Sequence, residues 1–189
     1  MSTKRVLRCV CEGAVFVAMA LVLSYIKIPI GMSFGGFGGS IDLVMIPLVL
    51  FAVRWGLGWG LGAGLIFGAL KYFFAAGFAV NWQSMVLDYS VAYMAVGFAG
   101  LFKNRKWGLV SGGLVGCLVR FAVHFVSGIT IYAQYMPEEF MNLTMTNTWI
   151  YSLLYNSTYM LPNTVIVIVA GAALSHPLRK YIKREDLAA

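Results

Sequence analysis

The residues that could do chemistry in this chain are ionisable side chains lying inside long apolar stretches. They are Asp42, Lys71, Asp88, Arg120 and His124. An ionised group near the centre of a bilayer costs at least about 2.5 kcal/mol, so such groups usually serve a substrate, an ion or a proton pathway. Two carboxylates, two cations and an imidazole suit charge-assisted hydrogen bonding to a polar ligand.

Catalytic and cofactor-binding motifs are absent from the sequence. No GxxxxGK is followed by Ser or Thr, which excludes ATP hydrolysis by this chain at the level of motifs. No HExxH pair accompanies His124, and no serine lies in a nucleophile motif with a base. Cys9, Cys11 and Cys117 are too few and too unevenly spaced for a zinc site or a disulfide framework. We therefore expect a protein that binds rather than catalyses, without a metal or a cofactor.

The stretches around these residues indicate a membrane protein. The chain has 189 residues, of which 60% are hydrophobic and 11% are charged, and its mean hydropathy is +0.81. A soluble core cannot bury that much apolar surface. Backbone groups in a bilayer must be satisfied within the protein, and long unbroken apolar runs favour helices over the alternating pattern of a barrel. The sequence predicts an all-α integral membrane protein whose first apolar segment is retained, because no signal-peptide cleavage site follows it.

Six apolar runs approach the roughly 20 residues needed to cross a bilayer. A single transmembrane domain, 1–189, is expected to form a six-helix bundle with spans near 10–29, 41–54, 57–77, 82–102, 108–132 and 149–175. The second run is short. The glycine-rich stretch before it, Gly31 to Gly39, is expected to dip into the membrane and line a cavity.

Charge on the connectors predicts orientation. Basic residues fall on alternate connectors, at Lys4, Arg5 and Arg8, at Arg54, at Lys103, Arg105 and Lys106, and at Arg179, Lys180, Lys183 and Arg184. The connectors 30–40, 78–81 and 133–148 contain no Lys or Arg. By the positive-inside rule both termini are expected to be cytoplasmic. The net charge of +7 is then explained without a nucleic-acid partner.

Small residues also follow a helical repeat. They recur every four positions at Gly56, Gly60, Gly64 and Gly68, and at Ala14 and Ala18. Such faces allow close helix packing, either within the chain or against another protein. Glu12, near the start of the first span, is expected to be an interfacial or partner-facing charge.

The ionisable residues are expected to share one depth in the membrane. At 1.5 Å per residue, Lys71, Asp88 and His124 lie roughly 9–12 Å from the outer ends of their spans. Asp42 begins its span at the outer side, and Asn156 lies at a similar depth in the sixth. Aromatic residues share that layer: Phe34, Phe37, Tyr72, Trp82, Tyr89, Tyr132 and Tyr151. The combination suits a small, flat, nitrogen-rich or cationic ligand.

Structural interpretations of the same residues stay open at this point. Asp88 could form an ion pair with Lys71 or Arg120, and His124 could be a structural histidine. The aromatic residues near the interface could form the belt seen in many membrane proteins without any ligand.

Several motifs resemble one family. They are Ala14-x-x-x-Ala18, Asp42-Leu-Val-Met-Ile-Pro47 leading to Arg54-Trp55-Gly56, Leu87-Asp88-Tyr89, His124-Phe125-x-x-Gly128 with Tyr132 and Gln134-Tyr135, and Tyr151-Ser152-x-x-x-Asn156. Over nearly its whole length the chain is similar to the thiamine-specific substrate-binding subunits (S-components) of energy-coupling factor (ECF) vitamin transporters.

The resemblance implies a non-catalytic protein of a prokaryotic cell membrane that captures thiamine from outside. Its partners would be a transmembrane coupling protein, on which Ala14 and Ala18 would dock, and two cytoplasmic ATPases. The positions that match the family's pocket are Asp42, Asp88, Tyr89, His124, Tyr132, Tyr151 and Asn156.

The chain departs from the family pattern at the pocket. Both carboxylates are aspartates where glutamates are usual, and Gly38 replaces a tryptophan for which Phe34 and Phe37 would substitute. Lys71 adds a positive charge near the expected ligand.

Three other functions remain open on the sequence. The first is an S-component for another small vitamin or aminopyrimidine. The second is a self-sufficient secondary transporter that relays protons through Asp88, Lys71 and His124. The third is a small intramembrane enzyme that depends on His124.

Overall fold

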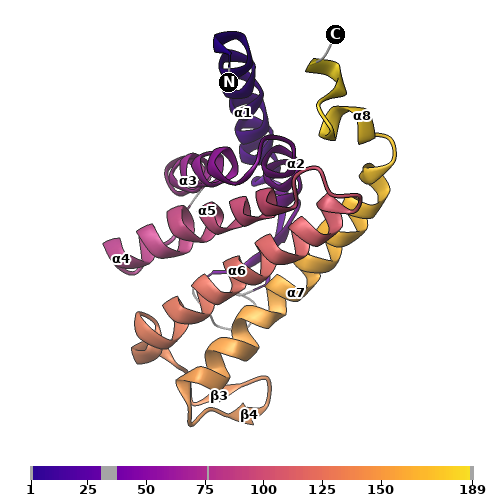
Figure 1. Ribbon diagram of the computed structural model, residues 1–189. Coiled ribbons are helices and arrows are strands. Elements are labelled where there is room, and N and C mark those ends of the chain that lie inside the picture. Colours follow the sequence, from indigo (N-terminus) through magenta and orange to yellow (C-terminus); the bar gives the residue numbers. More distant parts are fainter. Residues whose placement is uncertain (1, 31–37, 76, 188–189) are drawn as a thin grey trace.

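The computed structural model describes residues 2–30, 38–75 and 77–187, and this part of the chain is mostly helical (Figure 1). The long helices are α1 (Thr3–Leu23), α3 (Leu57–Phe74), α6 (Gly108–Thr130) and α7 (Thr148–Ser175), with the shorter α2 (Met45–Trp55). A further continuous helix, 82–102, consists of α4 (Trp82–Met85), a π-helical turn (Val86–Val91), α5 (Ala92–Val96) and a 3-10 segment (Gly97–Phe102).

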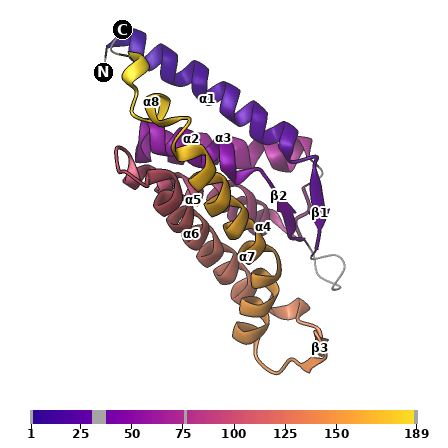
Figure 2. The same ribbon diagram turned by 90° about the vertical axis from the view of Figure 1, so that its right-hand side faces the viewer.

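Within the described residues, five helices are long and apolar enough to cross a membrane: α1, α3, the helix 82–102, α6 and α7. Helix α2 has 11 residues, which rise about 16 Å at 1.5 Å each. Ten of those residues are buried, because α1, α3, α6 and the segment 97–102 pack around the helix. The short second run of the sequence is therefore a central helix enclosed by protein. Helices α6 and α7 lie side by side along their lengths (Figures 1 and 2).

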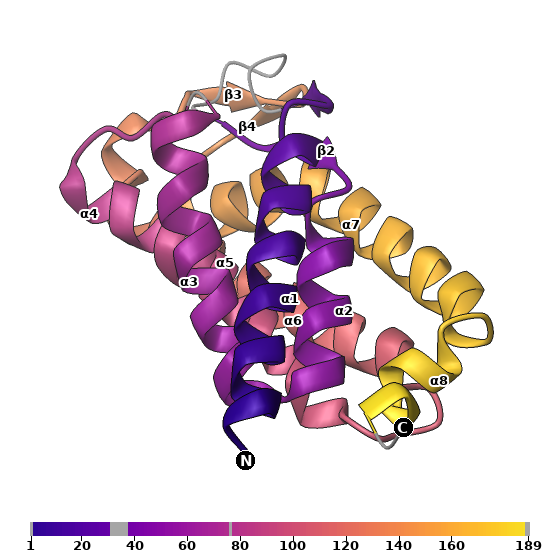
Figure 3. The same ribbon diagram turned by 90° about the horizontal axis from the view of Figure 1, so that it is seen from above.

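The two ends of the bundle differ in structure. At one end lie two antiparallel strand pairs, β1 (Lys27–Pro29) with β2 (Ser40–Asp42) and β3 (Glu139–Phe140) with β4 (Leu143–Thr144). At the other end the two chain termini lie close together, with α8 (Arg179–Ile182) and a 3-10 turn (Glu185–Leu187) (Figure 3). We call these the strand end and the terminal end.

The strand pair β1–β2 changes two expected boundaries. Helix α1 ends at Leu23, although its span was expected to reach residue 29. Asp42 lies in β2 rather than at the start of a helix, with its Cα opposite that of Lys27. The pairing satisfies backbone groups of 27–29 and 40–42 that a bilayer would leave without partners.

The repeated glycines mediate packing within the chain. A Cβ added to Gly64 would lie 2.2 Å from the carbonyl oxygen of Tyr93, and one on Gly68 would lie 2.3 Å from that of Tyr89. Helix α3 can therefore approach the helix 82–102 backbone to backbone only because these positions lack a side chain. The intramolecular interpretation of this face is confirmed.

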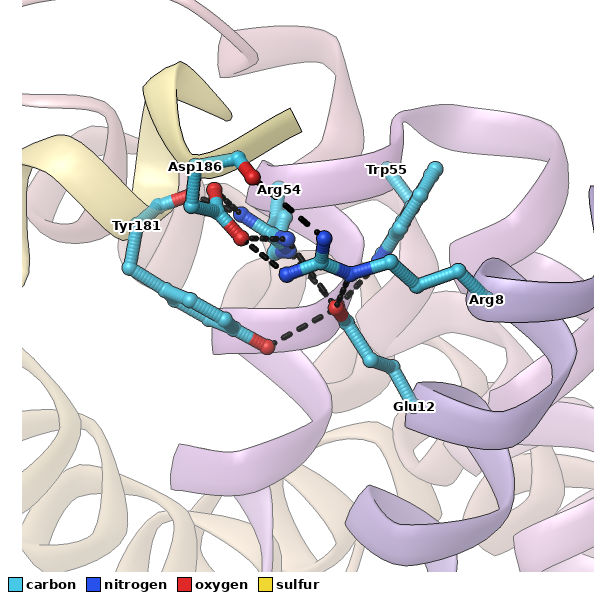
Figure 4. A network of polar contacts seen from close by, with 6 residues as sticks. All are labelled: Arg8, Glu12, Arg54, Trp55, Tyr181 and Asp186. Carbon is cyan, nitrogen blue, oxygen red and sulfur yellow. Dashed lines mark hydrogen bonds and ion pairs between the residues drawn. The ribbon is translucent and has the colours of Figure 1, made fainter. Parts of the chain in front are cut away.

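Two charged residues at the terminal end lie inside the chain. Arg54 was expected to mark a cytoplasmic connector, and its side chain is 0% exposed. Glu12 was expected to be interfacial or to face a partner, but its carboxylate accepts a hydrogen bond from Arg54 Nε at 2.7 Å (Figure 4). Both residues belong to a polar network inside the chain, because burial of the guanidinium requires nearby carboxylates.

Candidate functional site

The polar residues singled out in the sequence come together although each lies on a different element. Asp42 is on β2, Lys71 on α3, Asp88 in the π-helical turn, His124 on α6 and Asn156 on α7. A continuous series of side-chain contacts that also includes Tyr93 and Arg120 joins Asp42 and Lys71 to His124 and Asp88. A π-helical turn inserts an extra residue into a helix and redirects its side chains, and such turns are frequent at functional sites.

Asp42 and Lys71 form a buried ion pair. Lys71 Nζ lies 3.3 Å from Asp42 Oδ2, and their side chains are 8% and 1% exposed. Lys71 also donates to the Tyr93 hydroxyl at 2.5 Å. The carboxylate of Asp42 further accepts from Ser40 Oγ at 3.1 Å and from the backbone N–H of Val44 at 3.2 Å. The charge of Asp42 is therefore offset inside the protein.

Arg120 lies next in the chain of contacts. Its guanidinium carbon is 4.0 Å from the centroid of the Tyr93 ring, a cation–π contact. Its Nε donates to His124 Nε2 at 3.3 Å. Within the described part of the chain, Arg120 Nη1 is the one fully buried side-chain nitrogen or oxygen that lacks a hydrogen-bond partner. A buried donor of this kind is normally paired, so it can donate a hydrogen bond to a polar group of a ligand or to a water molecule.

His124 and Asp88 form the centre of the site. Because Arg120 Nε donates to His124 Nε2, the proton of the neutral imidazole lies on Nδ1. Nδ1 then donates to Asp88 Oδ1 at 3.1 Å, and Ser127 Oγ donates to Asp88 Oδ2 at 3.0 Å. Asp88 is thus held by two neutral donors, and its side chain remains 16% exposed.

Asn156 supports this centre from α7. Its amide nitrogen donates to the backbone oxygens of Ser152 at 2.8 Å and His124 at 3.4 Å. Its amide oxygen accepts from the Tyr159 hydroxyl at 2.5 Å. Gly128 allows the two helices to approach here, since a Cβ on it would lie 2.1 Å from Ser152 Oγ. Asn156 therefore fixes α7 against the turn of α6 that carries His124.

Three tyrosines follow one face of α7. Tyr151, Tyr155 and Tyr159 are spaced four residues apart, and successive ring centroids are 5.7 and 6.1 Å apart. Tyr151 also packs edge to face on Phe140 of β3 at 5.4 Å. The Tyr155 hydroxyl donates to the backbone oxygen of Gly38 at 2.5 Å. This row of rings joins the strand end to His124, whose ring lies 5.9 Å from that of Tyr159.

Other predicted residues lie apart from this centre. The Tyr89 hydroxyl exchanges hydrogen bonds with the backbone of Phe78, and its ring packs on Tyr72 at 5.2 Å. Trp82 is 71% exposed, as an interfacial aromatic residue would be. Phe34 and Phe37 lie outside the described residues.

Tyr132 follows α6 and lies near Asp88. Burial, followed by the neighbouring Asp88 carboxylate, raises the pKa of the Tyr132 hydroxyl above its ordinary value. The hydroxyl therefore stays protonated and can donate a hydrogen bond at neutral pH.

A cleft of about 520 Å³ opens at this end of the bundle. It is lined by Asn81, Gln83, Thr130, Ile131, Ala133 and Gln134. These residues are close in sequence to Ser84 on one side and to Tyr132 on the other, and four of the six are polar and uncharged.

Sequence reasoning missed Tyr93, Ser127, Tyr155, Tyr159 and Asn163. The spacing of Tyr151, Tyr155 and Tyr159 on one helical face was a usable signal for two of them. Tyr93 and Ser127 carry no such signal, because single polar residues in apolar runs become informative only when their neighbours in space are known.

The arrangement can bind but has no obvious reactive group. The negative charges of Asp42 and Asp88 equal in number the positive charges of Lys71 and Arg120. The neutral imidazole of His124 lies between Asp88 and Arg120. Among the described residues, no group of three or more His, Cys, Asp or Glu could hold a metal ion. Asp88 is the carboxylate left to meet a hydrogen-bond donor or a positive charge on a ligand.

Comparisons with known proteins agree on one family. The sequence model described as "Thiamine transporter protein" matches residues 10–183. The thiamine transporter ThiT of Bacillus subtilis is 33% identical over 188 residues, covering 92% of this chain and 93% of the relative. ThiT of Lacticaseibacillus paracasei is 27% identical over 181 residues, covering 87% and 85%. These relatives are transporters, not enzymes, as the sequence predicted.

Solved structures show the same fold. A structure of ThiT from Listeria monocytogenes superposes with a TM-score of 0.79 at 23% identity, covering 94% of this chain and 98% of that one. The S-component for biotin from an ECF-type ABC transporter superposes with a TM-score of 0.64 at 18% identity, covering 95% of each chain. The helical bundle is thus an S-component fold. The resemblance found in the sequence is confirmed, and the chain belongs to the thiamine transporter protein family.

Proposed function

We propose that this chain is the substrate-capture subunit of an ECF-type ABC importer and that it binds thiamine at the strand end. The observation that best supports this proposal is the position of Asp88, a carboxylate held by neutral donors beside a row of tyrosines on α7. Thiamine offers a donor amino group on its pyrimidine and a positive charge on its thiazolium, which match a carboxylate and aromatic faces. The ThiT relatives are named thiamine transporters, which supports this ligand.

Roles within the site follow from the contacts. Asp88 accepts from the aminopyrimidine, while His124 and Asn156 hold the geometry around it. Because Lys71 already neutralises Asp42, we assign the thiazolium to the faces of tyrosines such as Tyr151 rather than to Asp42. The same pairing explains how a lysine can lie near a cationic ligand.

The proposed orientation places the strand end outside and both termini in the cytoplasm of a prokaryotic cell. The basic residues in the first two turns of α1, after the helix 82–102 and after α7 support it by the positive-inside rule. All six helices would then form the membrane domain, with α2 enclosed by the other five. A transmembrane coupling protein and two ATPases would supply the energy. Ala14 and Ala18 are exposed on α1 and offer a small-residue face for the coupling protein.

The test is a titration of labelled thiamine against purified protein in detergent, with biotin as the comparison ligand. We expect saturable binding below micromolar ligand that biotin does not displace. A monodisperse preparation that shows no saturable thiamine binding would contradict the proposal. Displacement by another vitamin would assign the same site to that vitamin.

A secondary transporter is the competing function, favoured by the hydrogen-bonded series Arg120, His124 and Asp88, which could relay a proton. Reconstitution in liposomes separates the two. A capture subunit binds thiamine without concentrating it, whereas a secondary transporter accumulates it under an imposed proton gradient without any ATPase.

A further inference from the structure

A second polar network lies at the terminal end, remote in sequence from every proposed ligand contact. It joins three parts of the chain: Arg8 and Glu12 of α1, Arg54 and Trp55 of α2, and Tyr181 and Asp186 of the C-terminal segment (Figure 4). We call these six residues the terminal-end clasp. Nothing in substrate capture requires them.

Arg54 is the centre of the clasp and is completely satisfied. Its Nε and Nη2 donate to Glu12 at 2.7 and 3.0 Å. Its Nη1 and Nη2 donate to Asp186 at 3.0 and 2.9 Å, and Nη1 also donates to the backbone oxygen of Tyr181. A guanidinium has five N–H donors, and all five are used. Its carbon also lies 3.7 Å from the centroid of the Tyr181 ring.

The two carboxylates connect α1 to the C-terminal segment. Glu12 accepts from Trp55 Nε1 at 2.8 Å, from the Tyr181 hydroxyl at 2.9 Å and from Arg8 Nε at 3.1 Å. Arg8 also contacts Asp186. Two arginines therefore balance two carboxylates. Removing either carboxylate takes away two of the five hydrogen bonds of a buried guanidinium.

Helix α1 buries few of its side chains in the bundle, although Phe16 packs on Phe51 and on Tyr181. Of its 21 residues only Cys9, Val17 and Ala20 are buried. In a bilayer, apolar side chains gain little by leaving lipid for another helix, so packing and polar contacts decide where a helix lies. The clasp supplies such contacts at the end where α1 begins.

We propose that the C-terminal segment 178–187 is a latch that pins α1 against α2 through Arg54. With the latch closed, α1 has one fixed position and presents Ala14 and Ala18 on its exposed face. With the latch open, the first turns of α1 separate from the bundle. The latch itself is argued from the contacts of the clasp. The suggestion that a fixed α1 serves docking of the coupling protein rests on the proposed function.

The three cysteines of the chain make the latch measurable without any introduced cysteine. Cys9 is 0% exposed on α1, Cys11 is exposed on the same helix, and Cys117 is 1% exposed on α6. N-ethylmaleimide labelling followed by mass spectrometry reports each thiol. Local opening adds label at Cys9 alone, whereas global unfolding also adds it at Cys117.

The decisive comparison is Asp186→Asn with Glu185→Gln, a matched change at the exposed neighbouring residue. In the parent and in Glu185→Gln we expect label at Cys11 only. In Asp186→Asn we expect Cys9 to react on the order of tenfold faster, equivalent to about 1.4 kcal/mol in the opening equilibrium. Cys117 stays protected. An unchanged Cys9 rate in Asp186→Asn, or an equal gain in Glu185→Gln, would overturn the latch.

A milder variant keeps the test decisive if Asp186→Asn does not fold. Tyr181→Phe removes one hydrogen bond to Glu12 and retains the ring over Arg54, so a smaller but measurable gain at Cys9 is expected. No gain at Cys9 contradicts the latch. Thiamine binding, measured in the same samples, should stay within about twofold of the parent, a difference well under 1.4 kcal/mol. If the parent protein does not bind thiamine, the proposed function is contradicted. The labelling result still tests the latch, because it does not depend on thiamine binding.

Discussion

At the scale of single residues, Asp88 is the group on which we propose that thiamine recognition depends. Replacing it by Asn keeps the shape of the side chain and removes the negative charge. Hydrogen bonds to charged groups contribute about 1.5–3 kcal/mol, so we expect Asp88→Asn to weaken thiamine binding roughly 10- to 100-fold. Glu139→Gln, an exposed acid at the same end, serves as the control and should bind as the parent does. Equal affinity of Asp88→Asn and the parent would remove Asp88 from the site.

Asp42 and Lys71 form the second residue-scale test, because their charges cancel inside the protein. Removing one partner of a buried pair costs about 3–5 kcal/mol, since the other charge is left without a counter-ion. We expect Asp42→Asn and Lys71→Met each to lower the melting temperature strongly, and the double variant to recover much of the loss. Thermal unfolding of the parent, the two single variants and the double variant measures the interaction energy between the two side chains. Additive losses would show that the two side chains act independently.

At the scale of elements, the contact between α3 and the helix 82–102 depends on missing side chains. A Cβ at Gly64 would lie 2.2 Å from a backbone oxygen, whereas one at Gly62, on the same helix, would meet nothing within 4 Å. We expect Gly64→Ala to destabilise the fold by about 1–3 kcal/mol through overpacking. Gly62→Ala should be neutral or slightly stabilising. Thermal unfolding that ranks the two variants in the opposite order would refute this packing.

The C-terminal segment has its own pH dependence. Hydrogen bonding to Arg54 lowers the pKa of Asp186 from its ordinary value of 3.8. A carboxyl with a lowered folded-state pKa stabilises the fold above its unfolded pKa, and this contribution is lost as pH falls through the folded pKa. Arg8 also contacts the Asp186 carboxylate and stays positively charged over the whole pH range of the experiment. Glu12 is the other carboxylate that is hydrogen-bonded to Arg54.

The expected outcome is a difference in melting temperature between the parent and Asp186→Asn that is constant above about pH 5 and shrinks as pH falls below about 4. Melting curves across this range measure it, with Glu185→Gln as the reference. A difference that grows on acidification would contradict the assignment to Asp186.

At the scale of the whole molecule, we propose that the ligand is bound at the strand end and that the coupling protein docks along α1. Ala14 and Ala18 are exposed, and a tryptophan at either position would prevent close approach of another helix. We expect Ala14→Trp and Ala18→Trp to bind thiamine as the parent does but to lose co-purification with the co-expressed coupling protein and ATPases. Met19→Trp, at an exposed position about 100° around the helix from Ala18 and about 140° from Ala14, is the matched control. Co-purification retained in all three variants would place the docking face elsewhere.

The elements of the fold followed largely from local sequence. Hydropathy is a local property, so the membrane class and the long helices α3, α6 and α7 were predictable from apolar runs alone. The short run after residue 41 predicted a short helix, and α2 is one. The strand pair β1–β2 was not predicted, because pairing of Lys27 with Asp42 depends on a turn that carries no periodic signal.

The sequence by itself determined the membrane environment and the set of polar residues that a bilayer would exclude unless they had partners. Only the tertiary structure decided which partners those were. It paired Asp42 with Lys71, left Asp88 with two neutral donors, and buried Arg54 in the terminal-end clasp. The reason is physical: the cost of burying a charge is set by the residue and its depth. The contact that offsets this cost comes from elements distant in sequence, whose approach depends on the packing of the whole bundle.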